Sequence, residues 1–202
     1  LGDVYKRQIY RGDYNKFLKK NSIEEPVVLQ VGGSDNELLK FSTNLANKYG
    51  YQGVNLNVGC PSKKVSQGRM GACLMKEADI VRDCIKTMIS ESSSEVSVKC
   101  RIGVDEFESY NFFKEFISNV SDSGCNTFFV HARKAFLKGL DPKKNRTLPP
   151  LKYDYVYRLK REMPQLNIII NGGIQTLEEC HNQLKSVDGV WLVDLYKQIL
   201  FL

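Results

Sequence analysis

Six short runs rich in Val, Ile, Leu and Phe alternate along the chain with longer amphipathic stretches, and this alternation limits the possible folds. The runs are predicted strands, at 26–32, 53–59, 95–103, 126–132, 167–173 and 188–193. The stretches between them are predicted helices, at 35–50, 77–91, 108–122, 153–163 and 176–186. Apolar strands that alternate with helices predict parallel pairing, with the helices packed outside. A doubly wound sheet and a (β/α)8 barrel both fit this pattern.

Five of the predicted strands carry a polar residue within or just past their C-terminal ends: Gln30, Asn57, Lys99, His131 and Asn171. Barrel enzymes carry their sites at these ends, and a barrel gathers all five around one mouth. An open sheet would spread them along an edge, where only those near the switch point could share a ligand. We therefore predict the α/β class and an incomplete (β/α)8 TIM barrel, with about six of eight βα units present.

Composition bounds the class of protein. With 202 residues, 42% of them hydrophobic, the chain can bury one sizeable core, and its length favours one domain. Its six cysteines form no C-x-x-C pair, so neither a metal site nor a disulfide framework is expected. There is no apolar run near 20 residues and no signal-like leader, so we expect a cytoplasmic protein without membrane attachment. The net charge of +6 favours an anionic partner only weakly.

Four segments together resemble the tRNA-dihydrouridine synthases, and among them the A branch of that family. The segments are "NLNVGCPSKKVSQGRMGACLM" at 55–75, "VSVKCRIGVD" at 96–105, "FFVHARKAFLKGLDPKKNRTLPPLKYDYVYRLKREMP" at 128–164 and "IIINGGI" at 168–174. The resemblance runs from about residue 9 to 190. It implies a barrel that binds flavin mononucleotide (FMN) and uses NADPH to reduce the 5,6 double bond of selected uridines in tRNA.

Cys60 is the candidate catalytic acid. Reducing a uracil ring needs a hydride at one carbon and a proton at its neighbour, and only a cofactor can supply the hydride. The resemblance implies that the reduced flavin delivers this hydride to C6, and that Cys60 gives its proton to C5. A thiol, with a reference pKa near ~8.5, is mostly protonated at neutral pH and can donate a proton. Gly59 and Pro61 fit a tight turn that holds Cys60 at a strand end.

The resemblance also implies the residues that bind the flavin. Lys99 would reach the N1–C2 carbonyl edge, and Gln30 would hydrogen-bond the ring. Asn57 would contact flavin or substrate, although a strand-end asparagine can equally satisfy a loop backbone. The remaining ligands would be His131 and Arg133 of "HAR" and the phosphate loop of Asn171, Gly172 and Gly173.

A basic loop at 133–151, "RKAFLKGLDPKKNRTLPPL", would face the RNA. The residues expected to contact the substrate are Asn57, Arg101, Lys138, Lys143 and Arg146. Contacts to phosphates would give affinity and position rather than sequence reading, and would weaken with salt.

The two ends depart from the family pattern. Residues 1–8, "LGDVYKRQ", match nothing in the family and are interpreted as a non-native leader, which makes 9–190 the partial catalytic barrel. The tail at 191–202 has "WLVDLYKQ" where the family has an apolar pair followed by Gly-Arg. A shifted reading frame at 191–194 can encode Met-Val-Gly-Arg. The first two strands and a C-terminal helical domain of the family are also expected to be absent, so we interpret the chain as a fragment.

Two other functions stay open on the sequence. Another FMN barrel, such as a dihydroorotate dehydrogenase-like oxidoreductase, shares the lysine and the phosphate loop but does not need the long basic loop. An inactive RNA-binding relic is the non-enzymatic alternative.

Overall fold

The computed structural model describes residues 3–5, 18–20 and 25–192. In this part of the chain, one sheet contains seven parallel strands. They are β1 (Asp3–Tyr5), β2 (Val28–Gly32), β3 (Gly53–Asn57), β4 (Glu95–Arg101), β5 (Thr127–His131), β6 (Asn167–Asn171) and β7 (Gly189–Trp191). Neighbours in the sheet are neighbours in the chain, without a reversal. This order is that of a (β/α) barrel, because a doubly wound sheet reverses its strand order at a switch point.

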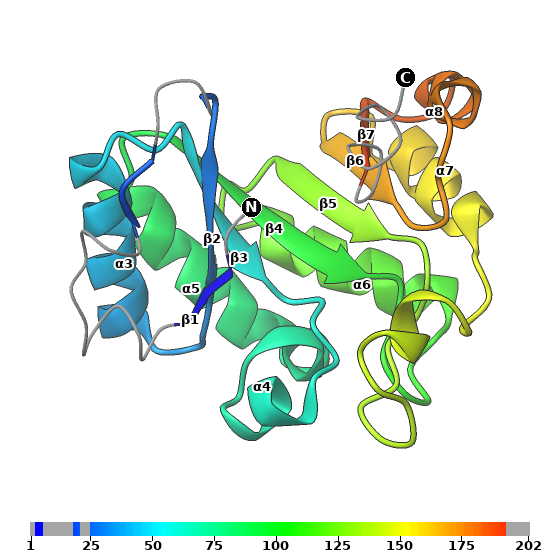
Figure 1. Ribbon diagram of the computed structural model, residues 1–202, viewed down its shortest axis with the longest axis horizontal. Helices are drawn as coiled ribbons and strands as arrows, with labels where there is room; N and C mark the ends of the chain where they lie inside the picture. Colours follow the sequence, from blue (N-terminus) through cyan, green and yellow to red (C-terminus); the bar gives the residue numbers. More distant parts are fainter. Residues whose placement is uncertain (1–2, 6–17, 21–24, 193–202) are drawn as a thin grey trace.

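The helices follow the strands as the sequence predicted. The main ones are α3 (Asn36–Lys48), α5 (Ala78–Glu91), α6 (Tyr110–Ser121), α7 (Tyr153–Glu162) and α8 (Leu177–Leu184). Figure 1 shows α4 (Lys63–Gln67) and the loop before α7 together at one end of the sheet. Two 3-10 turns, η2 (Gly71–Lys76) and η3 (Lys144–Arg146), belong to the same two loops. These loops follow the carboxyl ends of β3 and β5, so they flank the barrel mouth.

One expectation about the chain start needs correction. The sequence analysis left residues 1–8 outside the fold, but the structure places β1 there, with Val4 opposite Val31 of β2. A strand of three residues is too short to show a hydrophobic period, which explains why the sequence did not reveal it. That residues 1–8 are a non-native leader stays a prediction. Of the proposed reading-frame change at 191–194, residues 193 and 194 lie outside the described residues.

Alternation along each strand separates two faces of the sheet. Val54 and Leu56 of β3, like Val98 of β4, are fully buried on the face that the helices cover. The alternate residues form the inner face, where Asn55 lies opposite Ser97 and Asn57 opposite Lys99. Because side chains alternate across a strand, the apolar set packs under the helices and the polar set points into the barrel.

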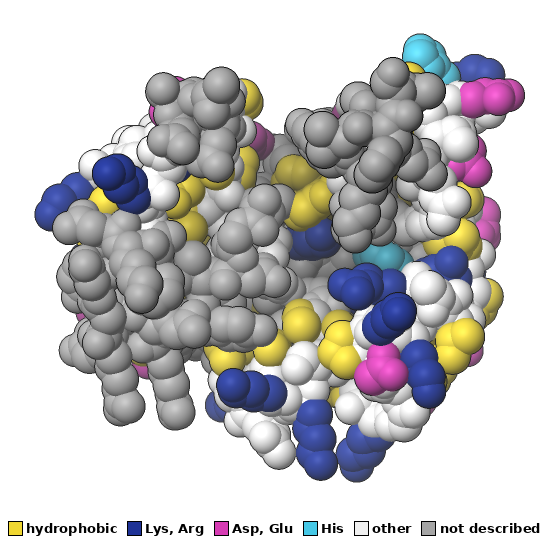
Figure 2. Space-filling view, viewed as in Figure 1, with side chains coloured by type: hydrophobic (Ala, Val, Ile, Leu, Met, Phe, Trp, Pro, Cys, Tyr) yellow, Lys and Arg dark blue, Asp and Glu magenta, His cyan; other side chains and the backbone are white. Residues whose placement is uncertain are grey.

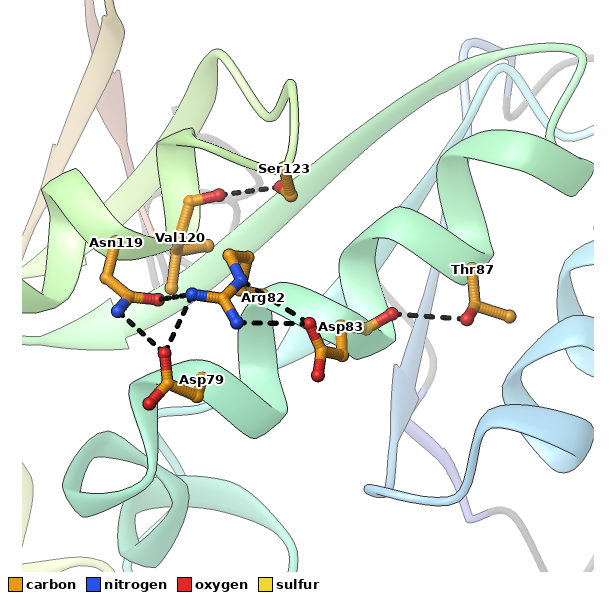
Figure 3. Close-up of polar contacts among 7 residues, drawn as sticks. All are labelled: Asp79, Arg82, Asp83, Thr87, Asn119, Val120 and Ser123. Carbon is orange, nitrogen blue, oxygen red and sulfur yellow. Dashed lines mark hydrogen bonds and ion pairs between the residues drawn. The ribbon is translucent and has the colours of Figure 1, made fainter.

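Polar side chains stabilise the outer layer locally. Asp35 caps α3 by accepting a hydrogen bond from the Leu38 N–H at 3.1 Å. A cluster on α5 and α6 joins these helices: Arg82 bonds Asp79 at 2.7 Å, and Asn119 bonds the same carboxylate at 3.0 Å (Figure 3). The Asp79 side chain is 73% exposed, so the ion pair contributes little to stability. The cluster lies on two outer helices, α5 and α6.

We expect Leu56→Ala to destabilise the protein by about 2–5 kcal/mol, because it removes a fully buried side chain beneath the helices. The urea midpoint of unfolding measures this effect. Leu177→Ala is the matched control, since Leu177 is 65% exposed and should change stability by less than about 0.5 kcal/mol. Equal losses in the two variants would contradict the assignment of the two faces.

Candidate active site

The carboxyl ends of three neighbouring strands bring Arg101, His131 and Asn171 into one row on the inner face. Asn57 and Lys99 lie in the row before it. Gln30 joins them through a hydrogen bond of 2.9 Å from Asn57 Nδ2 to Gln30 Oε1. All five strand-end residues predicted from the sequence therefore reach the mouth side of the inner face.

The Cys60 turn is held by backbone hydrogen bonds from both directions. Asn57 Oδ1 accepts from the N–H groups of Gly59 and Cys60, each at 3.0 Å. The Cys60 carbonyl accepts from the Ala72 N–H at 2.9 Å, which ties the turn to η2. Cys60 itself is half-buried. Asn57 thus satisfies the loop backbone, the alternative that the sequence left open, and this bonding positions Cys60.

The same hydrogen bonds determine how the amides of the inner face point. Asn57 must direct its oxygen at the turn, because the two backbone N–H groups can only donate. Asn57 Nδ2 therefore donates to Gln30, and Gln30 Nε2 donates to Asn55 Oδ1 at 2.7 Å. Asn55 Nδ2 continues the chain to Ser97 Oγ at 2.9 Å. Asn57 Oδ1 has both lone pairs occupied, so Asn57 can only donate to a ligand, through its second Nδ2 hydrogen.

Arg101 is buried beside the turn. Its Nε donates to the Gly59 carbonyl at 2.9 Å, and its Nη1 donates to the carbonyls of Lys134 at 3.1 Å and Asn145 at 2.9 Å. Burial lowers the pKa of Arg101 to about 10, so it remains a cation at neutral pH. These contacts give Arg101 a structural role, and a contact with substrate stays a prediction.

His131 is buried, and its Nδ1 has no hydrogen-bond partner among the described residues. Burial is the main cause that lowers the pKa of His131 to about 2. Nearby cations add to this effect: Arg101, Lys99, Arg133 and Arg146. The ring is therefore neutral at physiological pH and lies in an electropositive environment, which suits an anionic ligand.

Arg133 is half-buried next to His131. It donates to the Pro149 carbonyl through Nη1, while its buried Nε has no partner in the described part of the chain. Two neighbouring residues, His131 and Arg133, thus each leave one buried polar atom unsatisfied. Such atoms are rare in folded proteins and are expected where a ligand completes the bonding.

The turn after β6 is shaped for glycine. Gly172 and Gly173 have φ values of +115° and +72°. A Cβ on Gly173 would lie 2.7 Å from Leu151 Cδ1, and one on Gly172 would lie 3.2 Å from the His131 ring. Neither N–H donates a hydrogen bond within the described ranges. The turn therefore combines close packing with two backbone N–H groups that have no acceptor among the described residues, which fits a phosphate group.

Lys99 and Trp191 lie together on the inner face. Lys99 Nζ is 3.2 Å from the centroid of the Trp191 ring, and Phe129 meets that ring edge-on at 5.1 Å. The sequence analysis identified Trp191 as the start of a departure from the family. In the structure it covers the lysine expected to contact the flavin, and a ring that approached Lys99 would lie beside Trp191.

The basic loop is anchored at its centre and exposed at its rim. Asn145 is fully buried, and its side chain bonds the loop backbone at Phe136, Leu140 and Asp141. The exposed basic residues are Lys138, Lys143, Lys144 and Arg146. Figure 2 shows dark blue side chains gathered over this loop, beside a hollow in the surface.

Sequence reasoning missed three positioning residues. Gly71 leaves room for Cys60, since a Cβ there would lie 2.4 Å from the Cys60 carbonyl oxygen. Asn55 orients Gln30 from inside a predicted strand. Asn145 holds the basic loop, and an asparagine among Gly, Pro and Asp was the available signal, because such side chains often bond loop backbone. Among the described residues, no group of three or more His, Cys, Asp or Glu side chains could hold a metal ion, and no helix has the length and apolarity needed to cross a membrane.

Sequential parallel strands, outer helices and a polar, electropositive mouth define this structure as an incomplete (β/α) barrel with a candidate site at the strand carboxyl ends. The family model described as dihydrouridine synthase (Dus) matches residues 4–194, and the chain belongs to that family.

Curated relatives agree with this assignment. A tRNA-dihydrouridine(20/20a) synthase of Yersinia pestis is 51% identical over 177 residues, which cover 87% of this chain and 51% of the relative. The protein of the same name from Shewanella oneidensis is 52% identical, with coverage of 89% and 53%. That from Xanthomonas campestris pv. campestris is 45% identical, with coverage of 94% and 56%. The chain thus spans about half the length of the curated relatives it matches.

Solved structures support the fold. QR15, an aldolase, superposes with a TM-score of 0.60 at 14% identity, over 93% of this chain and 74% of that one. A putative lyase/mutase from Burkholderia cenocepacia J2315 gives a TM-score of 0.54 at 11% identity, over 85% of this chain and 57% of that one. At such low identity, these similarities concern architecture alone.

Gly71→Ala should displace the Cys60 turn, because the added Cβ would overlap the Cys60 carbonyl and Gly71 has a φ of +72°. We expect a loss of about 1–3 kcal/mol in urea unfolding and a changed rate of Cys60 alkylation by iodoacetamide. Gly50→Ala is the control: Gly50 has a φ of +67° and nothing within 4 Å of its Cβ position. If both variants lose the same stability, backbone strain alone explains the effect, and the approach of the new Cβ to the Cys60 carbonyl contributes nothing.

The depressed pKa of His131 predicts a loss of stability in acid. Below about pH 6.5 the unfolded chain takes up a proton at this position, while the native ring stays neutral down to about pH 2. From pH 7 to pH 5 this linkage should cost about 2 kcal/mol. Unfolding free energies of the wild type and His131→Asn measured over this range isolate the effect, because all other groups are common to both. Parallel pH profiles would show that the buried ring accepts a proton.

Proposed function

We propose that this chain is the barrel segment of a flavin-dependent tRNA-dihydrouridine synthase, which reduces the C5–C6 double bond of uridines 20 and 20a in tRNA with NADPH as reductant. The observation that carries the proposal is the family match over residues 4–194, together with relatives of about 50% identity that are named for this reaction. Residues 9–190, together with β1, form the catalytic barrel in this proposal. The protein is cytoplasmic, with neither metal nor membrane as partner.

The residues at the mouth fit FMN. Two observations support an anionic phosphate nearby. His131 and Arg133 each have an unsatisfied buried polar atom, and Gly172 and Gly173 offer two adjacent backbone N–H groups. The residues that would hold the cofactor are Gln30, Asn57, Lys99, His131, Arg133, Asn171, Gly172 and Gly173. Reduced flavin, when bound, supplies the hydride that no side chain can provide. Lys99 would offset negative charge on the flavin ring. His131 would be present as the neutral ring and would add no further charge to the site.

Cys60 donates the proton in this proposal. The turn is fixed by Asn57 and Ala72, so the thiol is presented from a backbone that does not need to reorganise. Asn57 can only donate, so the ligand atom that it meets must be an acceptor, such as a carbonyl oxygen of a pyrimidine ring. Lys138, Lys143 and Arg146 bind RNA phosphates, supported by their exposure on one anchored loop.

Cys60→Ala in the full-length protein should leave flavin binding intact and reduce dihydrouridine formation by about 10²- to 10⁴-fold, the usual contribution of a general acid. Single-turnover reaction of prereduced protein with tRNA that lacks dihydrouridine, followed by mass spectrometry of nucleosides, measures the rate. Cys73→Ala is the control, because Cys73 is half-buried on the adjoining η2 and its Sγ bonds the Met70 carbonyl. Wild-type rates for Cys60→Ala would remove this thiol from the mechanism.

A further inference from the structure

Arg101 connects two separate loops at the barrel mouth. Its side chain donates to three backbone carbonyls, that of Gly59 in the Cys60 turn and those of Lys134 and Asn145 in the basic loop. Arg101 is 4% exposed. A single buried guanidinium is therefore a common partner of segments that are 33 to 44 residues away from it in sequence.

The three carbonyl partners of Arg101 matter because no described carboxylate compensates its buried charge. No carboxylate pairs with it in the described part of the chain. After burial, which lowers the pKa of Arg101, Cys60 raises that pKa, whereas the like charges of Arg133 and Arg146 lower it further. A buried ion without a counterion depends on hydrogen bonds to offset its lost hydration. Loss of one carbonyl therefore weakens the position of the whole side chain, and with it the other two hydrogen bonds.

The basic loop is attached firmly at the point where it meets Arg101. Asn145 Oδ1 accepts from the Phe136 N–H at 2.7 Å, and Asn145 Nδ2 donates to the Phe136 carbonyl at 3.0 Å. The Asn145 carbonyl accepts from Arg101. Exposed Lys144 and Arg146 flank Asn145 in the chain. A ligand that orders these side chains also orders the carbonyl that Arg101 needs.

We propose that Arg101 is a positioning residue that couples the basic loop to the Cys60 turn. When the loop is in place, Arg101 has all three carbonyls and holds Gly59, which fixes the backbone next to Cys60. When the loop moves, Arg101 loses a partner and the turn loosens. The coupling is reciprocal, so loosening the turn also loosens the loop. Its consequence for catalysis rests on the proposed function, whereas the coupling itself does not.

Alkylation of Cys60 in the full-length protein tests the coupling without any activity assay. Iodoacetamide labelling of Cys60 is measured by peptide mass spectrometry as a rate relative to the wild type. Asn145→Ala removes an anchor of the loop and, because the turn loosens, should raise the labelling rate of Cys60 by about three- to tenfold, the effect of one hydrogen bond in a coupled network. Arg101→Lys should do the same, because an ammonium cannot span three carbonyls.

The double variant is decisive. If Arg101 carries the coupling, Asn145→Ala has no further effect on Cys60 in the Arg101→Lys background. Additive effects on labelling would overturn the proposal. Asn119→Ala, in the outer cluster of Figure 3, is the control and should leave the labelling rate of Cys60 unchanged.

A reciprocal measurement needs no Arg101 variant and remains valid if Arg101→Lys does not fold. Asn57→Ala releases the Cys60 turn and should speed tryptic cleavage after Lys143, Lys144 and Arg146 by about three- to tenfold relative to the wild type. Unchanged cleavage in a folded Asn57→Ala protein would contradict the coupling. In the single-turnover assay, Asn145→Ala should lower the rate at saturating tRNA as well as the affinity. A loss of affinity alone would restrict the loop to binding.

Discussion

Parallel pairing in chain order is the constraint on which the rest of this structure depends. Because each strand follows its neighbour in register, every second residue of β2 to β7 is directed to one inner face. The apolar residues between them are then buried under the helices. The rows that contain Asn57 with Lys99, and Arg101 with His131 and Asn171, follow directly from this register. The candidate site therefore depends on the register of the strand pairs more than on any single loop.

Hydrogen bonds to backbone groups shape the mouth. Asn57 binds two N–H groups of the Cys60 turn, Arg101 binds three carbonyls, and Asn145 closes the basic loop. Backbone partners cannot reorient independently of the fold, so such bonds position a loop more reliably than exposed ion pairs. Ion pairs also join mouth loops, Lys76 with Asp105 and Lys134 with Glu108, but their side chains are partly exposed.

Electrostatics divide the mouth into a charged part and a neutral part. Lys99, Arg101 and Arg133 make the environment positive, and burial with this charge keeps His131 neutral. The neutral ring avoids a further repulsive charge, and its unsatisfied Nδ1 remains suited to a polar ligand. The same residues thus provide a positive field and neutral hydrogen-bonding atoms, the two properties that an anionic cofactor with a polar ring requires.

The sequence by itself determined the class of fold and the residues at the strand ends. Alternating apolar runs and amphipathic stretches predicted parallel strands with outer helices, and their positions agree with the structure because burial imposes a period on the sequence. Gln30, Asn57, Lys99, His131 and Asn171 could be identified because a polar residue at the end of an apolar strand interrupts a visible pattern.

Tertiary structure alone decided the contacts of these residues. Arg101 looked like a substrate ligand in sequence, but its nearest partners come from loops 33 to 44 residues away. Gly71 matters through its approach to the Cys60 carbonyl, and Trp191 through its contact with Lys99. β1 is recognisable only by its pairing with β2. Periodicity records which face of an element is buried, whereas contacts between distant segments depend on how the chain folds back on itself, which no local pattern contains.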